Sequence, residues 1–143
     1  MNKVEDFIPI LLDTLSQGKD FIMPVNGTSM LPFIHKSHRV ILTSPTDLKK
    51  NDIVFYQREN GQYVLHRIYK VKKDYYVMMG DNQTFEEAPI YKHQIISKAK
   101  AVIKKNKTHN LKGLMYSLYL LFWNCKLVRR LLFPITRRIN YEK

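Results

Sequence analysis

Three residues with side chains suited to acyl transfer follow one another along the chain: Ser29, His66 and Asp81. A serine hydroxyl attacks a carbonyl carbon when a neutral imidazole accepts its proton, and a carboxylate behind the imidazole fixes the tautomer and stabilises the imidazolium. Taken singly, a turn serine, a strand histidine and a Gly-Asp-Asn turn usually have only structural roles. In this order, the three residues are candidates for a Ser-His-Asp set that the fold could bring together.

The stretch around Ser29 predicts a tight turn at the exit of a short apolar strand. Gly27 lets the backbone bend where a side chain would clash, and Pro32 prevents Ser29 from lying within a helix. Backbone N–H groups that converge on such a turn can donate to an oxyanion. The residues that we expect to contact the oxyanion or the substrate are Gly27, Thr28, Met30 and Pro32.

The first 110 residues predict a mainly β fold with one short N-terminal helix. Apolar residues at helical spacing between Val4 and Leu15 predict the helix, which Gly18 ends. Runs rich in Val, Ile, Tyr and Phe, separated by turn residues such as Asn60-Gly61, predict strands. The expected strands cover residues 21–25, 39–43, 52–57, 62–71, 74–79 and 94–104. His66 lies on the fourth of them, and Asp81 in the turn after the fifth.

Four ordered segments within residues 20–104 resemble the conserved boxes of the signal-peptidase family, which shares its β fold with phage-repressor-type autoproteases. They are Gly27-Thr28-Ser29-Met30-Leu31-Pro32, Asn51-Asp52-Ile53-Val54, Val64-Leu65-His66-Arg67-Ile68 and Gly80-Asp81-Asn82. The resemblance implies an antiparallel β fold and a serine endopeptidase that cleaves signal or leader peptides after small residues. It also implies that Ser29 is the nucleophile and Asp81 the supporting acid. His66 is then the base, as in archaeal and endoplasmic-reticulum forms.

The chain departs from this family pattern in four places. Gly27 stands where a serine often assists the oxyanion, so Thr28 or backbone N–H groups must replace that hydroxyl. Glu87 stands in place of a second aspartate and is a further candidate for the supporting acid. Asn51 replaces a usual glycine, which a left-handed backbone conformation at Asn tolerates. The membrane anchor that family signal peptidases carry before the serine has no counterpart here, since no stretch of about 18 apolar residues is present.

The C-terminal part of the chain is more basic than the rest. The 143 residues carry a net charge of +12, and residues 104–143 hold ten of the 24 Lys and Arg but only one of the 12 Asp and Glu. Such an asymmetry indicates a local anionic partner, either a membrane surface or a nucleic acid. We expect no nucleic acid, because the basic residues accompany an apolar stripe and the aromatic strand boxes of RNA-binding modules are missing.

Apolar residues between Leu111 and Val128 recur with a period of 3.6 and predict an amphipathic helix. Two interpretations stay open, namely a helix packed on the sheet and a helix lying in a membrane interface. Nearby Trp, Tyr and Arg residues favour the second. We therefore expect a catalytic β domain over residues 1–110 and a basic amphipathic segment over residues 111–143. Residues 111–135 would hold the protein peripherally on a membrane, at its cytoplasmic face.

Other residues that could do chemistry have less support from the sequence. Lys70 shares a strand face with His66, but about 13 Å separates residues four apart on a strand, so both cannot serve Ser29. His35 and His38 lack the helical context and the carboxylates of a metal site, so we expect neither a metal nor another cofactor.

The sequence also allows two alternatives to a signal peptidase, namely a repressor autoprotease and a catalytically silent family member. A repressor autoprotease is disfavoured, because the 28 residues before Ser29 contain no helix-turn-helix pattern. A catalytically silent family member that binds leader peptides or a membrane partner stays open as the alternative.

Overall fold

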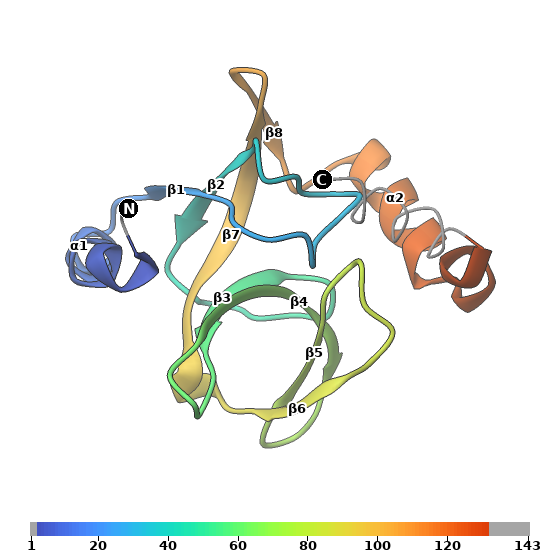
Figure 1. Ribbon diagram of the computed structural model, residues 1–143, viewed down its shortest axis with the longest axis horizontal. Helices are drawn as coiled ribbons and strands as arrows, with labels where there is room; N and C mark the ends of the chain where they lie inside the picture. Colours follow the sequence, from blue (N-terminus) through green and yellow to red (C-terminus); the bar gives the residue numbers. More distant parts are fainter. Residues whose placement is uncertain (1–2, 132–143) are drawn as a thin grey trace.

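Antiparallel β-sheet dominates the computed structural model, which describes residues 3–131 (Figure 1). In this part of the chain, eight strands form one sheet in the order β1-β2-β7-β3-β4-β5-β6, and β8 pairs with β7. The strands are β1 Phe21–Pro24, β2 Arg39–Thr43, β3 Ile53–Gln57, β4 Tyr63–Val71, β5 Tyr76–Met79, β6 Glu87–Ile90, β7 Ile95–Lys104 and β8 Lys107–Asn110. The sheet curves strongly, so that β3 to β6 wrap around a common interior (Figure 1).

This mainly antiparallel β fold with helices near both ends confirms the fold class predicted from the sequence. The six expected strands correspond to β1, β2, β3, β4, β5 and β7, with ends that differ by at most two residues. Strands β6 and β8 were not predicted from the sequence. Pro89 interrupts the strand pattern in β6, and β8 is short, polar and fully exposed, so neither shows the apolar alternation by which a strand is recognised.

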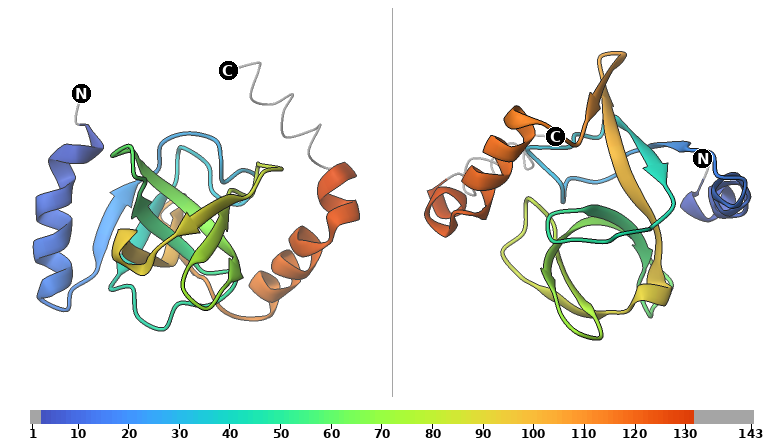
Figure 2. Two further views of the ribbon diagram at one scale, coloured as in Figure 1. Left: turned by 90° about the horizontal axis from the view of Figure 1, so that it is seen from below. Right: turned by 180° about the vertical axis from the view of Figure 1, so that it is seen from behind.

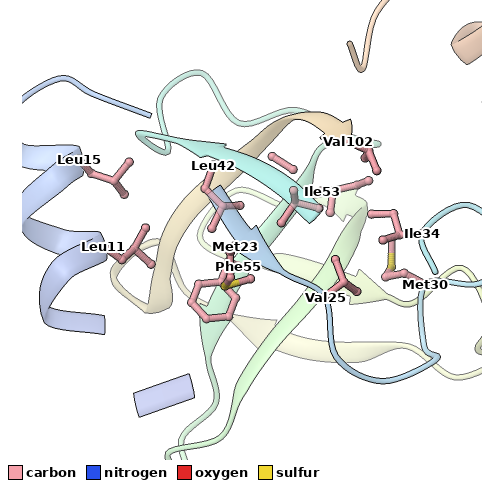
Figure 3. Packing of buried hydrophobic residues seen from close by; sticks show 12 residues of the cluster. Leu11, Leu15, Met23, Val25, Met30, Ile34, Leu42, Ile53, Phe55 and Val102 are labelled. Carbon is pink, nitrogen blue, oxygen red and sulfur yellow. The ribbon is translucent and has the colours of Figure 1, made fainter. Parts of the chain in front are cut away.

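Helix α1 (Val4–Ser16) covers one end of the sheet, as the apolar spacing predicts. The backbone N–H of Lys3 donates to the Asp6 carboxylate at the start of the helix, and Gly18 ends it with a φ of 71°. Leu11 and Leu15 point from α1 into the main apolar core, where they join residues of β1, β2 and β3 (Figure 3).

Strand β3 is buried on both faces and separates two apolar clusters. Ile53 and Phe55 face the main core, whereas Val54 and Tyr56 face a second cluster inside the curved part of the sheet. His66 pairs with Val54 across the β3–β4 ladder, so it lies on the face of this second cluster.

The turn that carries Ser29 rests directly against the loop between β5 and β6. The backbone N–H of Asn82 donates to the Ser29 carbonyl at 2.8 Å, and its side-chain Nδ2 donates to the Thr28 carbonyl at 3.1 Å. Gly80 makes this contact possible, because a Cβ at that position would lie 2.5 Å from the Ser29 carbonyl oxygen. The β5–β6 loop therefore determines where the Ser29 turn lies.

Helix α2 (Leu114–Asn124) lies beside the sheet, on the opposite side of the molecule from α1 (Figures 1 and 2). Residues 126–131 continue as a further helical segment, and residues 132–143 of the predicted C-terminal segment lie outside the described part of the chain. Between residues 3 and 131, no helix has both the length and the apolar character needed to cross a membrane.

Candidate active site

Ser29 and His66 line the same cleft, between the β1–β2 turn and strand β4. The cleft has a volume of about 280 Å³, and Gly27, Met30 and Gln83 also contribute to its wall. Ser29 Oγ makes no hydrogen bond to any of the described residues, so its hydroxyl is free to turn toward the imidazole. In ligand-free enzymes a nucleophile and its base commonly approach closely only when substrate binds.

Burial keeps the imidazole of His66 neutral. Only 2% of the residue is exposed, and this burial is the main cause that lowers the pKa of His66 to about 4. The nearby guanidinium of Arg58 acts in the same direction, whereas the carboxylates of Glu87 and Asp81 oppose the shift. At neutral pH the ring can therefore accept a proton, as a general base must.

Tyr56 is the hydrogen-bond partner of His66, with its hydroxyl 3.3 Å from Nδ1. Burial, followed by the charge of Glu87, raises the pKa of the Tyr56 hydroxyl, which therefore stays protonated. Glu87 is in turn fixed by Arg58, whose Nε and Nη2 donate to its two oxygens at 2.9 and 2.6 Å. In the tautomer that a general base at Nε2 requires, the Tyr56 oxygen accepts from Nδ1–H of His66. Nε2 is then left unprotonated.

Asp81 lies elsewhere than a Ser-His-Asp set requires. Both of its carboxylate oxygens accept hydrogen bonds from Arg67, from Nε and Nη2 at 2.8 Å each, and Tyr119 donates its hydroxyl to the same carboxylate. The structure shows no hydrogen bond between Asp81 and His66 in residues 3–131. The sequence predicted Asp81 as the partner of His66, but the buried Arg67 on β4 binds its carboxylate instead.

Arg67 is buried and hydrogen-bonds to three other residues. Besides Asp81, it donates from Nη1 to the Asn51 carbonyl at 2.8 Å and to the Tyr116 hydroxyl at 2.7 Å. Its guanidinium also lies 5.4 Å from the centre of the Phe33 ring. Burial works against the charged form, but the Asp81 carboxylate more than offsets this and raises the pKa of Arg67. Asn51 has a φ of 77°, the left-handed conformation expected at the place of a family glycine.

The residues predicted to contact the oxyanion or the substrate divide into two groups. Gly27, with a φ of 81°, and the buried Met30 line the cleft with Ser29. Thr28 and Pro32 do not line it. The Thr28 carbonyl is held by Asn82, and Pro32, after a cis peptide bond, lines a groove beside α2. Which N–H groups would serve an oxyanion stays a prediction.

Most of this chain matches the model of one protein family. The model of the family described as Peptidase S24-like matches residues 1–102, a range that contains Ser29, His66 and Asp81. The chain belongs to the peptidase S24-like family. Membership supports a serine-peptidase type of hydrolase in general, and the family also includes repressors. No curated protein matches the chain.

Several residues that shape the site of this S24-like protein were not predicted from its sequence, namely Tyr56, Arg58, Arg67 and Tyr119. One signal was available, since an arginine between apolar residues of a buried strand requires a carboxylate partner. Tyr56 and Arg58 carried no such signal, because only the pairing of β3 with β4 brings Tyr56 to the face of His66.

The remaining candidates lie away from the cleft. Lys70 is exposed on the far part of β4 and pairs with Glu86 at 2.8 Å. His38 accepts a hydrogen bond at Nδ1 from the backbone N–H of His35. Within residues 3–131 of this S24-like protein, no group of three His, Cys, Asp or Glu is placed to hold a metal ion.

Asp81→Asn should destabilise the whole fold, because it leaves the buried Arg67 charge without its carboxylate. Breaking one side of a buried ion pair typically costs about 3–5 kcal/mol. We expect urea denaturation, followed by circular dichroism, to show a loss of that order in the free energy of unfolding. Glu86→Gln is the matched control, since it removes the same charge from a pair open to solvent and should change stability little. Equal stability of the two variants would contradict the structural role of Asp81.

Proposed function

We propose that this protein is a serine endopeptidase of signal-peptidase type, with Ser29 as nucleophile and His66 as general base. One observation carries the proposal: the Ser29 hydroxyl and a neutral, buried imidazole line the same small cleft. The variant with a histidine base is preferred because Lys70, the nearest lysine candidate on the strand, is not part of that cleft.

The proposed reaction follows from the two side chains. Ser29 Oγ attacks the carbonyl carbon of the scissile peptide bond while His66 Nε2 takes the hydroxyl proton. The imidazolium then gives this proton to the leaving amine, and an acyl ester remains on Ser29. A water molecule, deprotonated by the same nitrogen, attacks the ester and releases the new carboxyl end. Ser29 and His66 return to their starting protonation states.

Tyr56 takes the positioning role that a triad aspartate has elsewhere. A carboxylate beside the imidazole fixes its tautomer and stabilises the imidazolium. Here the neutral hydroxyl of Tyr56 fixes the tautomer, and the charge of Glu87 behind it favours the imidazolium. Asp81 supports the site through Arg67 and the loop that touches the Ser29 turn.

The substrate is proposed to be a signal or leader peptide with small residues before the scissile bond. The support for this substrate is the resemblance of the segments around Ser29, His66 and Asp81 to the boxes of the signal-peptidase family. Backbone N–H groups near Gly27 and Thr28 are the proposed oxyanion donors, because Gly27 offers no hydroxyl. The alternative is a silent member that binds the same peptides without cleaving them.

Ser29→Ala and His66→Ala should each lower the rate of peptide cleavage by at least about a thousandfold, as loss of a nucleophile or base does in serine proteases. The test is a peptide library with small residues at the first and third positions before the bond. New termini are mapped by mass spectrometry. Cleavage that survives in Ser29→Ala would refute the assigned nucleophile. Peptide binding by all three proteins, with no cleavage by wild type, would support the silent alternative.

The pH dependence of wild-type cleavage should reflect the low pKa of His66. Because the unprotonated ring is the active form, kcat/KM should persist below pH 6.5 and fall only as the pH drops through about 4. An unfolded chain binds a proton on this ring near pH 6.5, so acid also weakens the fold. Circular dichroism at each pH separates the two effects. Loss of activity near pH 6.5 with the fold intact would contradict the neutral, buried base.

Tyr56→Phe should lower kcat about ten- to a hundredfold with little change in KM, because general-base catalysis as a whole contributes about 10²–10⁴. Nitrogen-15 NMR of His66 provides a second measurement. Wild type should show the proton on Nδ1, and the variant should shift it toward Nε2. Tyr76→Phe, on the same apolar cluster but outside the cleft, is the control and should change neither. An unchanged tautomer in Tyr56→Phe would contradict the positioning role.

A further inference from the structure

Helix α2 presents two faces of different chemistry. Its inner face packs on the sheet through aromatic residues: Tyr119 stacks on Phe33 at 4.7 Å, and Trp123 is buried. Its outer face is apolar and open to solvent. We call this the outer α2 face, and its residues, with their exposed fractions, are Leu114 75%, Met115 79%, Leu118 40%, Leu121 69% and Phe122 60%. A contiguous exposed apolar surface of this kind marks an interaction site.

The outer α2 face continues into the following helical segment. Leu127 and Leu131 are each 66% exposed, and each directly follows an exposed cation, Lys126 and Arg130 respectively. Apolar and basic side chains thus alternate along one stretch, which is the composition of helices that lie at a lipid surface.

A groove beside α2 adds a place for an anion. It runs between α2 and β8, has a volume of about 650 Å³, and is lined by Phe33, Val102 and Met115 together with the cations Lys104 and Lys112. The Lys104 ammonium lies 4.9 Å from the centre of the Phe33 ring, and no carboxylate pairs with it in the described chain. Burial lowers the pKa of Lys104, as expected for a partly desolvated cation without a counter-ion.

We propose that the outer α2 face and the adjoining groove bind the surface of a membrane that contains anionic phospholipids. The apolar side chains enter the boundary between headgroups and acyl chains, and lipid phosphates contact Lys104 and Lys112. The charge of the chain agrees with this partner, because residues 104–143 contain ten Lys and Arg and one acidic residue. This surface is separate from the Ser29 cleft, so the proposal goes beyond the peptidase function.

Hydrogen bonds on the side of α2 that faces the sheet fix the helix on the protein, so a membrane contact through its outer face would be rigid. Tyr116 and Tyr119 hydrogen-bond to Arg67 and Asp81 respectively, and Arg129 of the following helical segment donates to the carbonyls of Gly80 and Gln83. The helix on the lipid is therefore joined directly to the loop behind the Ser29 turn. A membrane-bound protein would hold its cleft in a defined orientation at the lipid surface.

The test is co-sedimentation of the full chain with vesicles of phosphatidylcholine alone or with about one third phosphatidylglycerol. We expect binding at least about tenfold tighter to the anionic vesicles and weaker at high salt. Met115→Glu with Leu121→Glu should reduce this binding at least about tenfold, because both side chains leave the apolar surface. The control is Ile10→Glu with Leu12→Glu, which adds the same charge at exposed apolar positions of α1 and should bind as wild type.

A second pair of variants tests the groove. Lys104→Gln with Lys112→Gln should weaken binding to anionic vesicles about tenfold, whereas Lys72→Gln with Lys73→Gln, the same charge change on an exposed hairpin, should not. Equal losses in both pairs would overturn the site and leave only a general charge effect. Absence of binding by wild type would overturn the proposal, as would a dimer in light scattering that Met115→Glu with Leu121→Glu dissociates. Cleavage of soluble peptides reports on the peptidase function separately.

Discussion

The buried ion pair between Arg67 and Asp81 joins three parts of the molecule at one point. Arg67 lies on β4, Asp81 lies in the β5–β6 loop, and Tyr116 and Tyr119 bring α2 to the same pair. Removing two charges from water is costly, and only complete hydrogen bonding offsets the cost. Both carboxylate oxygens and several guanidinium N–H groups have partners here. The position of the β5–β6 loop, and with it of the Ser29 turn, depends on this pair.

Because side chains alternate along β4, the Arg67–Asp81 pair and the candidate base His66 lie on opposite faces of the strand. Neighbouring residues on β4 point to opposite faces, so His66 turns toward the cleft and Tyr56 while Arg67 turns toward Asp81. The Asp81 carboxylate is engaged by Arg67 and Tyr119, and the hydrogen bond to Nδ1 of the imidazole comes from Tyr56 instead. Burial lowers the pKa of His66, and the carboxylates of Glu87 and Asp81 only partly oppose this shift.

Helix α2 shows why periodicity alone left two interpretations open. The apolar stripe predicts an amphipathic helix, but a stripe does not indicate which face meets the protein. In the structure the aromatic residues Tyr116, Tyr119 and Trp123 face the sheet, because their rings and hydroxyls match Phe33, Arg67 and Asp81. Leu114, Leu118 and Leu121 face outward. Packing on the sheet and an exposed apolar face therefore occur together, on opposite sides of one helix.

The sequence by itself determined the β class, the first helix, six of the strands, and the presence of Ser29 and His66 in recognisable boxes. These features depend on local patterns, namely apolar alternation, turn residues and short motifs. Only the tertiary structure decided which side chains meet. Asp81 pairs with Arg67, and Tyr56 lies beside His66. Glu87 belongs to β6, which was not predicted as a strand because Pro89 interrupts its pattern. Such partners are set by strand register and by the energetic need to pair a buried charge, and both arise only when distant segments pack.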